Sequence, residues 1–131
     1  RGTIRRYLEP RGLPPFLDDL RRTQGPYAVS GGLAAARLAP IAPPRLALVW
    51  ARPGSVDPAA LGLRPADSGA NVFVVEPEDD AVFEGVTESN GLRFAAASQV
   101  AADLLTSPGR GPAEGDALLA WMERNEDAWR G

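Results

Sequence analysis

Apolar runs bounded by turn residues predict several short strands along the chain. Residues 27–29 (YAV) and 45–53 (RLALVWARP) are apolar and β-prone, and Pro53 and Gly54 end the second run. Residues 69–77 (GANVFVVEP) are apolar almost throughout, which is typical of a strand buried on both faces. These three runs predict the centre of a β-sheet.

The segment after the third run predicts more sheet structure around a tight turn. The acidic run EPEDD, residues 76–80, is expected to form a loop. Beyond it we expect a short strand at residues 81–84, a turn at Ser89–Asn90–Gly91 and a strand at residues 92–96.

Helix start signals occur three times in the first half of the chain. Residues 14–22 (PPFLDDLRR) have Pro in the first turn and Arg in the last. Residues 31–38 follow Ser30, which we expect to cap a helix there. Within residues 56–63 (VDPAALGL), we expect a one-turn helix capped by Asp57.

Two segments near the C-terminus predict a packed helical pair. Ser98 is expected to cap the first helix, and Pro112 is expected to open the second. Their apolar faces are formed by Val100, Leu104 and Leu105 in the first helix and by Leu118, Leu119 and Met122 in the second.

The order of these elements predicts an α/β or α+β fold, with a small mixed β-sheet, flanking helices and a C-terminal helical pair. The 131 residues fit one domain. The formal net charge of −3 gives no overall basic field for nucleic acid. No apolar run approaches the ~20 residues needed to cross a bilayer, so no membrane contact is expected.

The composition excludes several kinds of catalytic site. The chain has no Cys, no His and no Lys, so all 14 basic residues are Arg. Zinc sites with sulfur ligands, thiolate nucleophiles, Schiff bases and P-loops are thereby excluded. Ser30 and Ser98 have no His or Lys that could activate them as nucleophiles.

The first 25 residues are rich in Arg and interrupted by Pro. Because residue 1 is Arg rather than Met, we expect a longer protein, in which residues 1–25 connect an upstream domain to a domain formed by residues 26–131. The segment is either such a linker or a solvated surface helix. If the upstream domain binds DNA, the candidate phosphate contacts here are Arg5, Arg6, Arg21 and Arg22.

Acidic side chains around the third apolar run raise the alternative of metal-dependent chemistry. Asp67, Glu76 and Asp80 would be the first ligands for Mg²⁺ or Ca²⁺. A metal-dependent nuclease usually adds a Lys, which this chain lacks, so a solvated acidic loop is preferred. The turn SGGLAA, residues 30–35, is a candidate anion site, but the next strand lacks the paired carboxylates of a nucleotidyltransferase. A structural role is preferred there as well.

Four segments occur in a recognisable order: YAVSGGLAA, APPRLALVW, GLRPADSGANVFVVEP and SQVAADLLTSPGRGPAEGDALLAWM. The most specific part is a helix followed by Pro-Gly-Arg and an Ala/Glu-rich helix. Its matching residues are Ser98, Gln99, Asp103, Leu104, Leu105, Pro108, Gly109 and Arg110. Over roughly residues 25–130, this order resembles the C-terminal domain of the AbiEi family, the antitoxins and transcriptional regulators of type IV toxin–antitoxin systems.

The resemblance implies a non-enzymatic, cytoplasmic regulator that uses no cofactor. An N-terminal winged helix–turn–helix, absent from this chain, would bind operator DNA, and the C-terminal domain would supply antitoxicity in phage defence. The functional partner would be a nucleotidyltransferase toxin, opposed without a stable complex. Two alternatives stay open: a metal-dependent nuclease or degenerate nucleotidyltransferase-like domain, and a ligand-sensing domain with a closed apolar pocket.

The loop SPGRGP, residues 107–112, joins the two C-terminal helices. Its prolines and glycines predict a tight corner. Arg110 is its only long side chain, and we expect it to pair with Asp103 or Glu114. A contact with a phosphate or a protein partner is the alternative role.

Overall fold

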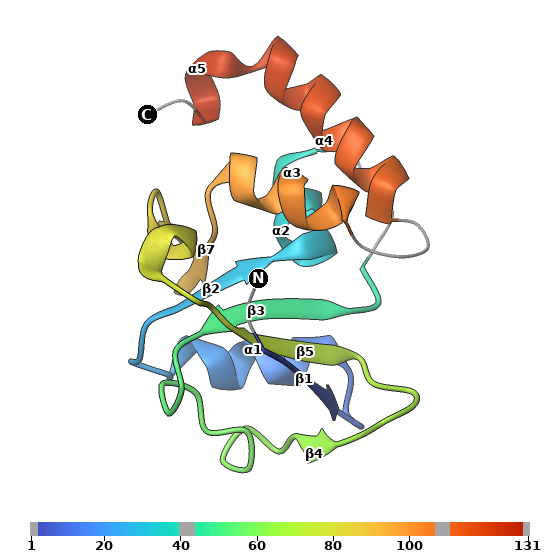
Figure 1. Ribbon diagram of the computed structural model, residues 1–131, viewed down its shortest axis with the longest axis vertical. Coiled ribbons are helices and arrows are strands. Elements are labelled where there is room, and N and C mark those ends of the chain that lie inside the picture. The colour runs from blue at the N-terminus through green and yellow to red at the C-terminus, as the bar shows by residue number, and fades with distance from the viewer. Residues whose placement is uncertain (1–2, 40–43, 107–110, 130–131) are drawn as a thin grey trace.

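A seven-stranded mixed sheet forms the centre of the molecule (Figure 1). The computed structural model describes residues 3–39, 44–106 and 111–129. The strands are β1 (Thr3–Leu8), β2 (Tyr27–Ser30), β3 (Ala47–Ala51), β4 (Arg64–Pro65), β5 (Val72–Glu76), β6 (Thr87–Ser89) and β7 (Leu92–Phe94). Their order in the sheet is β4-β1-β5-β3-β2-β7-β6.

Helices lie on both sides of this sheet, which confirms the predicted α/β class. They are α1 (Leu13–Arg21), α2 (Gly31–Leu38), α3 (Ala97–Leu105), α4 (Gly111–Arg124), α5 (Glu126–Trp129) and the 3-10 helix η1 (Asp80–Phe83). Helix α2 packs on β2 and β3, α3 contacts α2 and β2, and α4 packs across α2 and α3. Helix α1 lies on the other side, behind β5 and β1 in Figure 1.

The two central strands are parallel and well buried. Strand β5 pairs with β3 in parallel, from Ala47 beside Val72 to Trp50 beside Val75. Val72, Val74 and Val75 are all buried, although neighbouring side chains of a strand point to opposite faces. The prediction that this run is buried on both faces is therefore confirmed for these three valines, whereas Phe73, on the same face as Val75, is only partly buried.

Residues 3–21 belong to the same sheet-and-helix unit, so the predicted connector over residues 1–25 is wrong. Strand β1 lies between β4 and β5 and pairs with β5 from Thr3 beside Glu76 to Tyr7 beside Val72. Helix α1 buries Phe16 and Leu20 completely. Residue 26 is consequently not a domain boundary.

The junction between β2 and α2 corrects the predicted cap at Ser30. Gly31 has φ +64°, a left-handed conformation that turns the chain directly from strand into helix. A Cβ there would lie 3.3 Å from the Cβ of Leu48. Ser30 occupies the cap position but makes no side-chain capping bond, because its hydroxyl points to α3 instead.

The predicted turn at Ser89–Asn90–Gly91 is confirmed as the hairpin between β6 and β7. Asn90 has φ +57° and Gly91 has φ +78°, the left-handed pair that a two-residue type I′ turn requires. The strand predicted at residues 81–84 is instead η1, because the Asp79 carboxylate accepts from Ala81 N and favours a helical turn. Strand β6 was not predicted.

Two other expected helix starts differ from the structure in part or in full. Residues 56–63 form consecutive hydrogen-bonded turns rather than a helix, although Asp57 Oδ1 accepts from Ala60 N at 3.4 Å, as the predicted cap requires. Helix α3 begins at Ala97 and has no side-chain cap, so Ser98 lies exposed in its first turn. Leu105 and Leu119, expected on apolar faces, are 41% and 36% exposed.

Candidate functional site

Asp103 is a buried acidic side chain at the contact between α3 and the sheet. It is 5% exposed. Its Oδ2 accepts a hydrogen bond from Ser30 Oγ at 2.6 Å and another from Trp50 Nε1 at 2.9 Å. Its Oδ1 accepts from Gln99 Nε2 at 3.0 Å, one helical turn away. We call Ser30, Trp50, Gln99 and Asp103 the Asp103 cluster.

The chain conformation brings these four side chains together. Trp50 and Ser30 lie on neighbouring antiparallel strands, where Ala28 is opposite Trp50 and Ser30 is opposite Leu48, so both side chains point to the α3 face. Gln99 and Asp103 are four residues apart and share one side of their helix. Because one carboxylate accepts hydrogen bonds from both strands and from its own helix, the cluster joins β2, β3 and α3.

The Asp103 cluster does not form a nucleophilic site. The Ser30 hydroxyl is completely buried, and its partner is a carboxylate without an intervening base. A serine nucleophile needs a base such as His or Lys to remove its proton, and the chain has neither. The arrangement therefore serves structure rather than acyl transfer.

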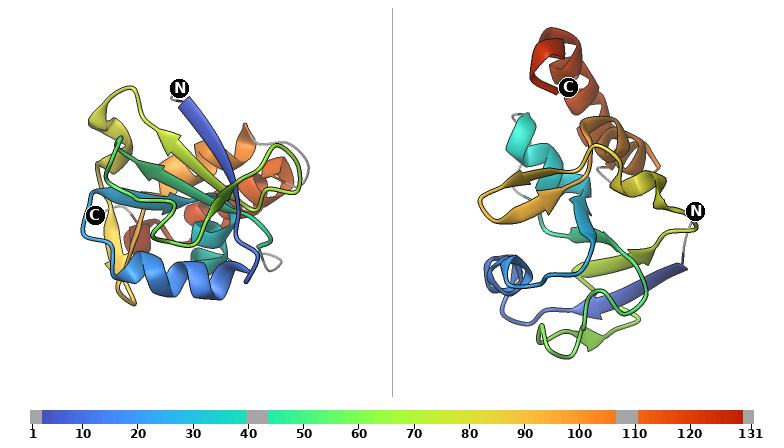
Figure 2. Two further views of the ribbon diagram at one scale, coloured as in Figure 1. Left: turned by 90° about the horizontal axis from the view of Figure 1, so that it is seen from below. Right: turned by 90° about the vertical axis from the view of Figure 1, so that its left-hand side faces the viewer.

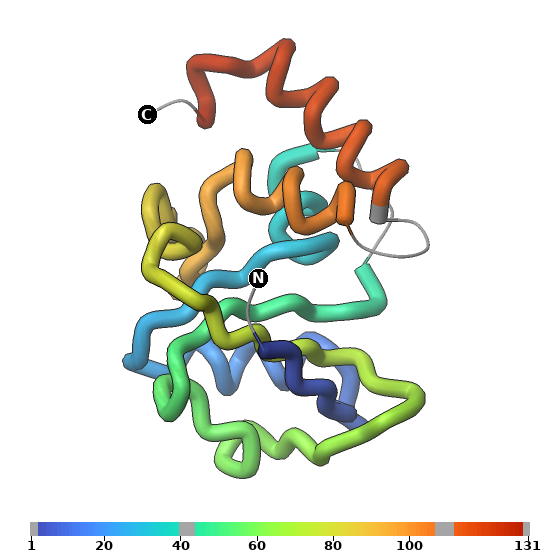
Figure 3. Tube along the Cα trace, in the orientation of Figure 1, coloured from blue at the N-terminus to red at the C-terminus, as the bar shows by residue number. Residues whose placement is uncertain are grey.

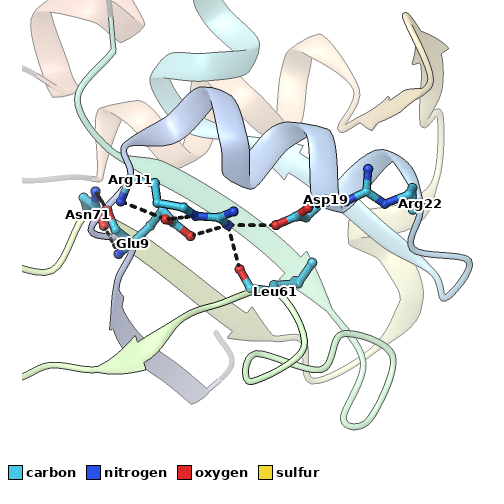
Figure 4. A network of polar contacts seen from close by, with 6 residues as sticks. All are labelled: Glu9, Arg11, Asp19, Arg22, Leu61 and Asn71. Carbon is cyan, nitrogen blue, oxygen red and sulfur yellow. Dashed lines mark hydrogen bonds and ion pairs between the residues drawn. The ribbon is translucent and has the colours of Figure 1, made fainter.

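Glu9 is the second buried carboxylate, at the turn between β1 and α1 (Figure 4). Arg11 Nε donates to Glu9 Oε1 at 2.8 Å, and Arg11 Nη2 donates to Glu9 Oε2 at 3.1 Å. The same Nη2 reaches Asp19 Oδ2 at 2.8 Å on α1. Asn71 joins the group through paired hydrogen bonds with the Glu9 backbone, at 2.7 and 3.0 Å. We call Glu9, Arg11, Asp19 and Asn71 the Glu9 cluster.

These contacts shift the acidities of the Glu9 cluster. The hydrogen bonds from Arg11 hold the pKa of Glu9 below its usual value, because pairing favours the charged form more than burial disfavours it. The same guanidinium lowers the pKa of Asp19. The pKa of Arg11 is raised in return, chiefly by Glu9 and then by Asp19. All three groups are therefore charged near neutral pH.

The arginines predicted to contact DNA or a partner do not form one patch. Arg5 pairs with Glu76 at 3.2 Å on β1. Arg21 bonds Asp18 and donates to Asn90 O at 2.8 Å beside the β6–β7 turn, and Arg22 pairs with Asp19. From β1 to β7 there are four strand steps, or about 19 Å at ~4.8 Å each. Arg6 is exposed, and Arg110 lies outside the described residues.

The acidic candidates for metal binding also lie apart. Among residues 3–39, 44–106 and 111–129, no three Asp or Glu side chains gather in a way that could hold a metal ion. Glu76 pairs with Arg5, Asp80 pairs with Arg52, and Asp67 is exposed. The convergence that a metal-dependent nuclease would require is not present in this part of the chain.

The structure assigns different roles to the residues of the family-like motif. Gln99 and Asp103 form the Asp103 cluster, whereas Ser98 is exposed. Pro108, Gly109 and Arg110 lie outside the described residues, so the predicted corner is not described. The candidate anion site at the start of α2 is approached by an acid of the chain itself: Glu114 Oε1 lies 3.4 Å from where a Cβ on Gly32 would be.

The sequence interpretation missed both clusters. An acid two residues before an Arg at a Pro-containing turn, as in Glu9 and Arg11, was a usable signal for the Glu9 cluster. For the Asp103 cluster, the indole N–H of Trp50 in an apolar strand requires a partner when buried, and that requirement points to a buried acceptor. Asp103 was that acceptor.

Two further observations concern ligands and membranes. A surface hollow at the junction of α4 and α5 is lined mainly by charged and polar residues: Glu123, Arg124, Asn125, Glu126, Asp127 and Ala128. It does not fit the apolar ligand pocket of a sensing domain. Within the described ranges, no helix combines the length and the apolar character that a membrane span requires.

Fold and clusters together define an α/β domain whose buried acids hold its layers together. No family model, no curated protein and no solved structure matches the chain.

Proposed function

We propose that the chain is the regulatory domain of an AbiEi-like type IV antitoxin and transcriptional repressor, and that it is not an enzyme. The observation that supports this is the Asp103 cluster. Ser30 and Trp50 belong to the first two family-like segments, and Gln99 and Asp103 belong to the last. Ser30 is 73 positions from Asp103 in the sequence, and Trp50 is 53 positions from it, yet each forms a hydrogen bond with Asp103. Such contacts between distant segments are expected when the segments together specify one fold.

The proposed partners follow from the same resemblance. Operator DNA would be bound mainly by a winged helix–turn–helix in the complete protein, in the cytoplasm. The toxin would be a nucleotidyltransferase, whose action is opposed without a stable complex. The separated and mostly ion-paired arginines described above support only an accessory DNA contact for this domain.

Co-expression tests this proposal. The complete natural protein is expressed together with the nucleotidyltransferase encoded beside its gene, and growth is followed after toxin induction. We expect growth to be restored, and we expect a gel shift with the promoter of the same gene pair. A variant of the surface, Arg124→Ala, serves as a folded control. Unrelieved growth arrest by a folded complete protein would rule out the antitoxin role.

A further inference from the structure

One face of the sheet has no helix over β5 and β1. In the right-hand view of Figure 2, α1 lies on one side of these strands and no described α-helix lies on the other. Trp50 points to the α3 face, because it bonds Asp103. Leu48, two residues before it, shares that face. The register places Phe73 between Leu48 and Arg6, and Val75 between Trp50 and Ile4.

These side chains are accessible and mostly apolar. Ile4 is 46% exposed, and Leu46 at the entry to β3 is 49% exposed. Leu48 and Phe73 are only partly buried. Arg64, opposite Leu8 at the edge of the sheet, continues the same face. We call Ile4, Arg6, Leu48, Arg64 and Phe73 the open face.

The charged side chains of the open face are all positive. Arg6 and Arg64 are exposed, and neither makes an ion pair or a side-chain hydrogen bond within the described part of the chain. By contrast, Arg5 on the opposite face of β1 pairs with Glu76. By the alternation of β1, β3 and β5, the open face contains no carboxylate from these strands. The guanidinium groups of Arg6 and Arg64 are therefore available to bind acidic partners.

We propose that the open face binds an amphipathic helix of another polypeptide, whose apolar stripe is flanked by carboxylates. Parallel strand pairs such as β3 and β5 are normally covered by helices on both faces. Carboxylates match the planar donor fork of Arg6 and Arg64. Ile4, Leu46 and Leu48 are aliphatic, and Phe73 is the one aromatic residue of the open face. This composition favours peptide side chains over nucleic-acid bases, because successive bases bind by stacking on several aromatic rings. This surface is independent of the antitoxin role.

A pair of synthetic peptides tests the proposal. Both have Leu at positions i, i+3, i+4 and i+7 over about five helical turns, and Glu flanks the stripe in one and Lys in the other. In NMR titrations we expect saturable shifts of β1 and β5 amides with the Glu peptide only. Arg6→Glu with Arg64→Glu should weaken binding about tenfold or more. Arg45→Glu, an exposed arginine at the entry to β3, should leave binding unchanged.

Several results would overturn the proposal. The Glu and Lys peptides would bind equally, or neither would bind saturably. Binding of oligothymidylate to the open face without peptide binding would indicate a nucleic-acid surface instead. Self-association that Ile4→Asp abolishes, measured by analytical ultracentrifugation, would show that a second copy covers this face. Unchanged thermal melting of each variant confirms that folding is not the cause.

Discussion

Asp103 is a buried acid that receives donors from two strands and from its own helix. A buried polar group is tolerated only when hydrogen-bond partners such as these replace the water that it has lost. No described buried side-chain nitrogen or oxygen lacks a hydrogen-bond partner, so the donors around it also depend on this carboxylate. Removing the carboxylate thus affects several groups together.

We expect Asp103→Ala to lower the free energy of unfolding by about 3–5 kcal/mol, because the Ser30 hydroxyl and Trp50 indole lose their acceptor in a buried place. Asp103→Asn, which keeps one oxygen for these donors, should cost less. Urea unfolding followed by Trp fluorescence measures both. Equal stability of wild type and Asp103→Ala would contradict the structural role of the cluster.

The Glu9 cluster should make stability depend on pH. The pKa values of Glu9 and Asp19 are lowered in the folded chain from 4.5 and 3.8. A lowered carboxyl pKa stabilises the fold fully above the unfolded value, and this stabilisation is lost as pH falls through the folded pKa. We therefore expect the urea midpoint to fall steadily below about pH 4.5.

Replacing Arg11 provides the matched test of that pH dependence. Arg11→Met removes the largest cause of both lowered pKa values, so the loss of stability between about pH 7 and about pH 3 should shrink. Arg45→Met, which removes an exposed arginine elsewhere, should keep the wild-type profile. Identical profiles for Arg11→Met and wild type would show that other acids control the acid response.

At the scale of elements, the contact between α3 and α4 depends on a glycine. A Cβ on Gly115 would lie 2.9 Å from Leu105 Cδ2 and 3.2 Å from the Leu105 backbone nitrogen. Such distances are too short for ordinary packing, so the helices would have to separate. Gly115 sits inside α4, where Ala would otherwise be the better helix former.

Gly115→Ala should consequently destabilise the chain by about 1–3 kcal/mol, opposite in sign to the gain expected from helix propensity. Adding Leu105→Ala removes the side-chain part of the clash. The double variant should therefore cost less than the sum of the two single variants. Thermal and urea unfolding measure all three. A stabilised Gly115→Ala would show that α4 can move away from α3 at no cost.

Elements marked by helix start signals or by a long apolar run were predictable. Residues 14–22 and 31–38 have such start signals and residues 69–77 form such a run, and α1, α2 and β5 lie within three residues of the expected bounds. Capping was less predictable, because the Ser30 hydroxyl can either accept from a backbone N–H as a helix cap or donate to a distant carboxylate, and here it donates to Asp103. Strand β1 was missed because the arginines of TIRRYL mask its alternation.

At the scale of the whole molecule, the two ends of the described chain contribute unequally to stability. Strand β1 lies inside the sheet and α1 buries Phe16 and Leu20, each worth about 1.5–3 kcal/mol when fully buried. Helix α5 buries no residue and is attached to α4 through Trp129 Nε1, which donates to Met122 O at 2.8 Å. Deleting β1 and α1 should therefore lower the free energy of unfolding far more than deleting α5.

A chain that starts at residue 26 should fail to fold, because it exposes the edge of β5 and removes part of the core. A chain that ends at residue 125, without α5, should keep most of its stability. Amide dispersion in NMR spectra and far-UV circular dichroism distinguish the two outcomes. A well-dispersed spectrum from residues 26–131 alone would restore the boundary that the sequence had suggested.

The position of β1 also has a consequence for synthesis. This strand is synthesised about 70 residues before its partner β5, which ends at Glu76, so it stays unpaired on that side until β5 has been made. An unpaired apolar strand would invite aggregation during that interval, and charged side chains on an edge prevent it. We therefore expect the charges of Arg5 and Arg6 to limit aggregation of the nascent chain. Because the pairing of β1 with β5 joins distant residues, we expect closure of the sheet to be a slow step of folding.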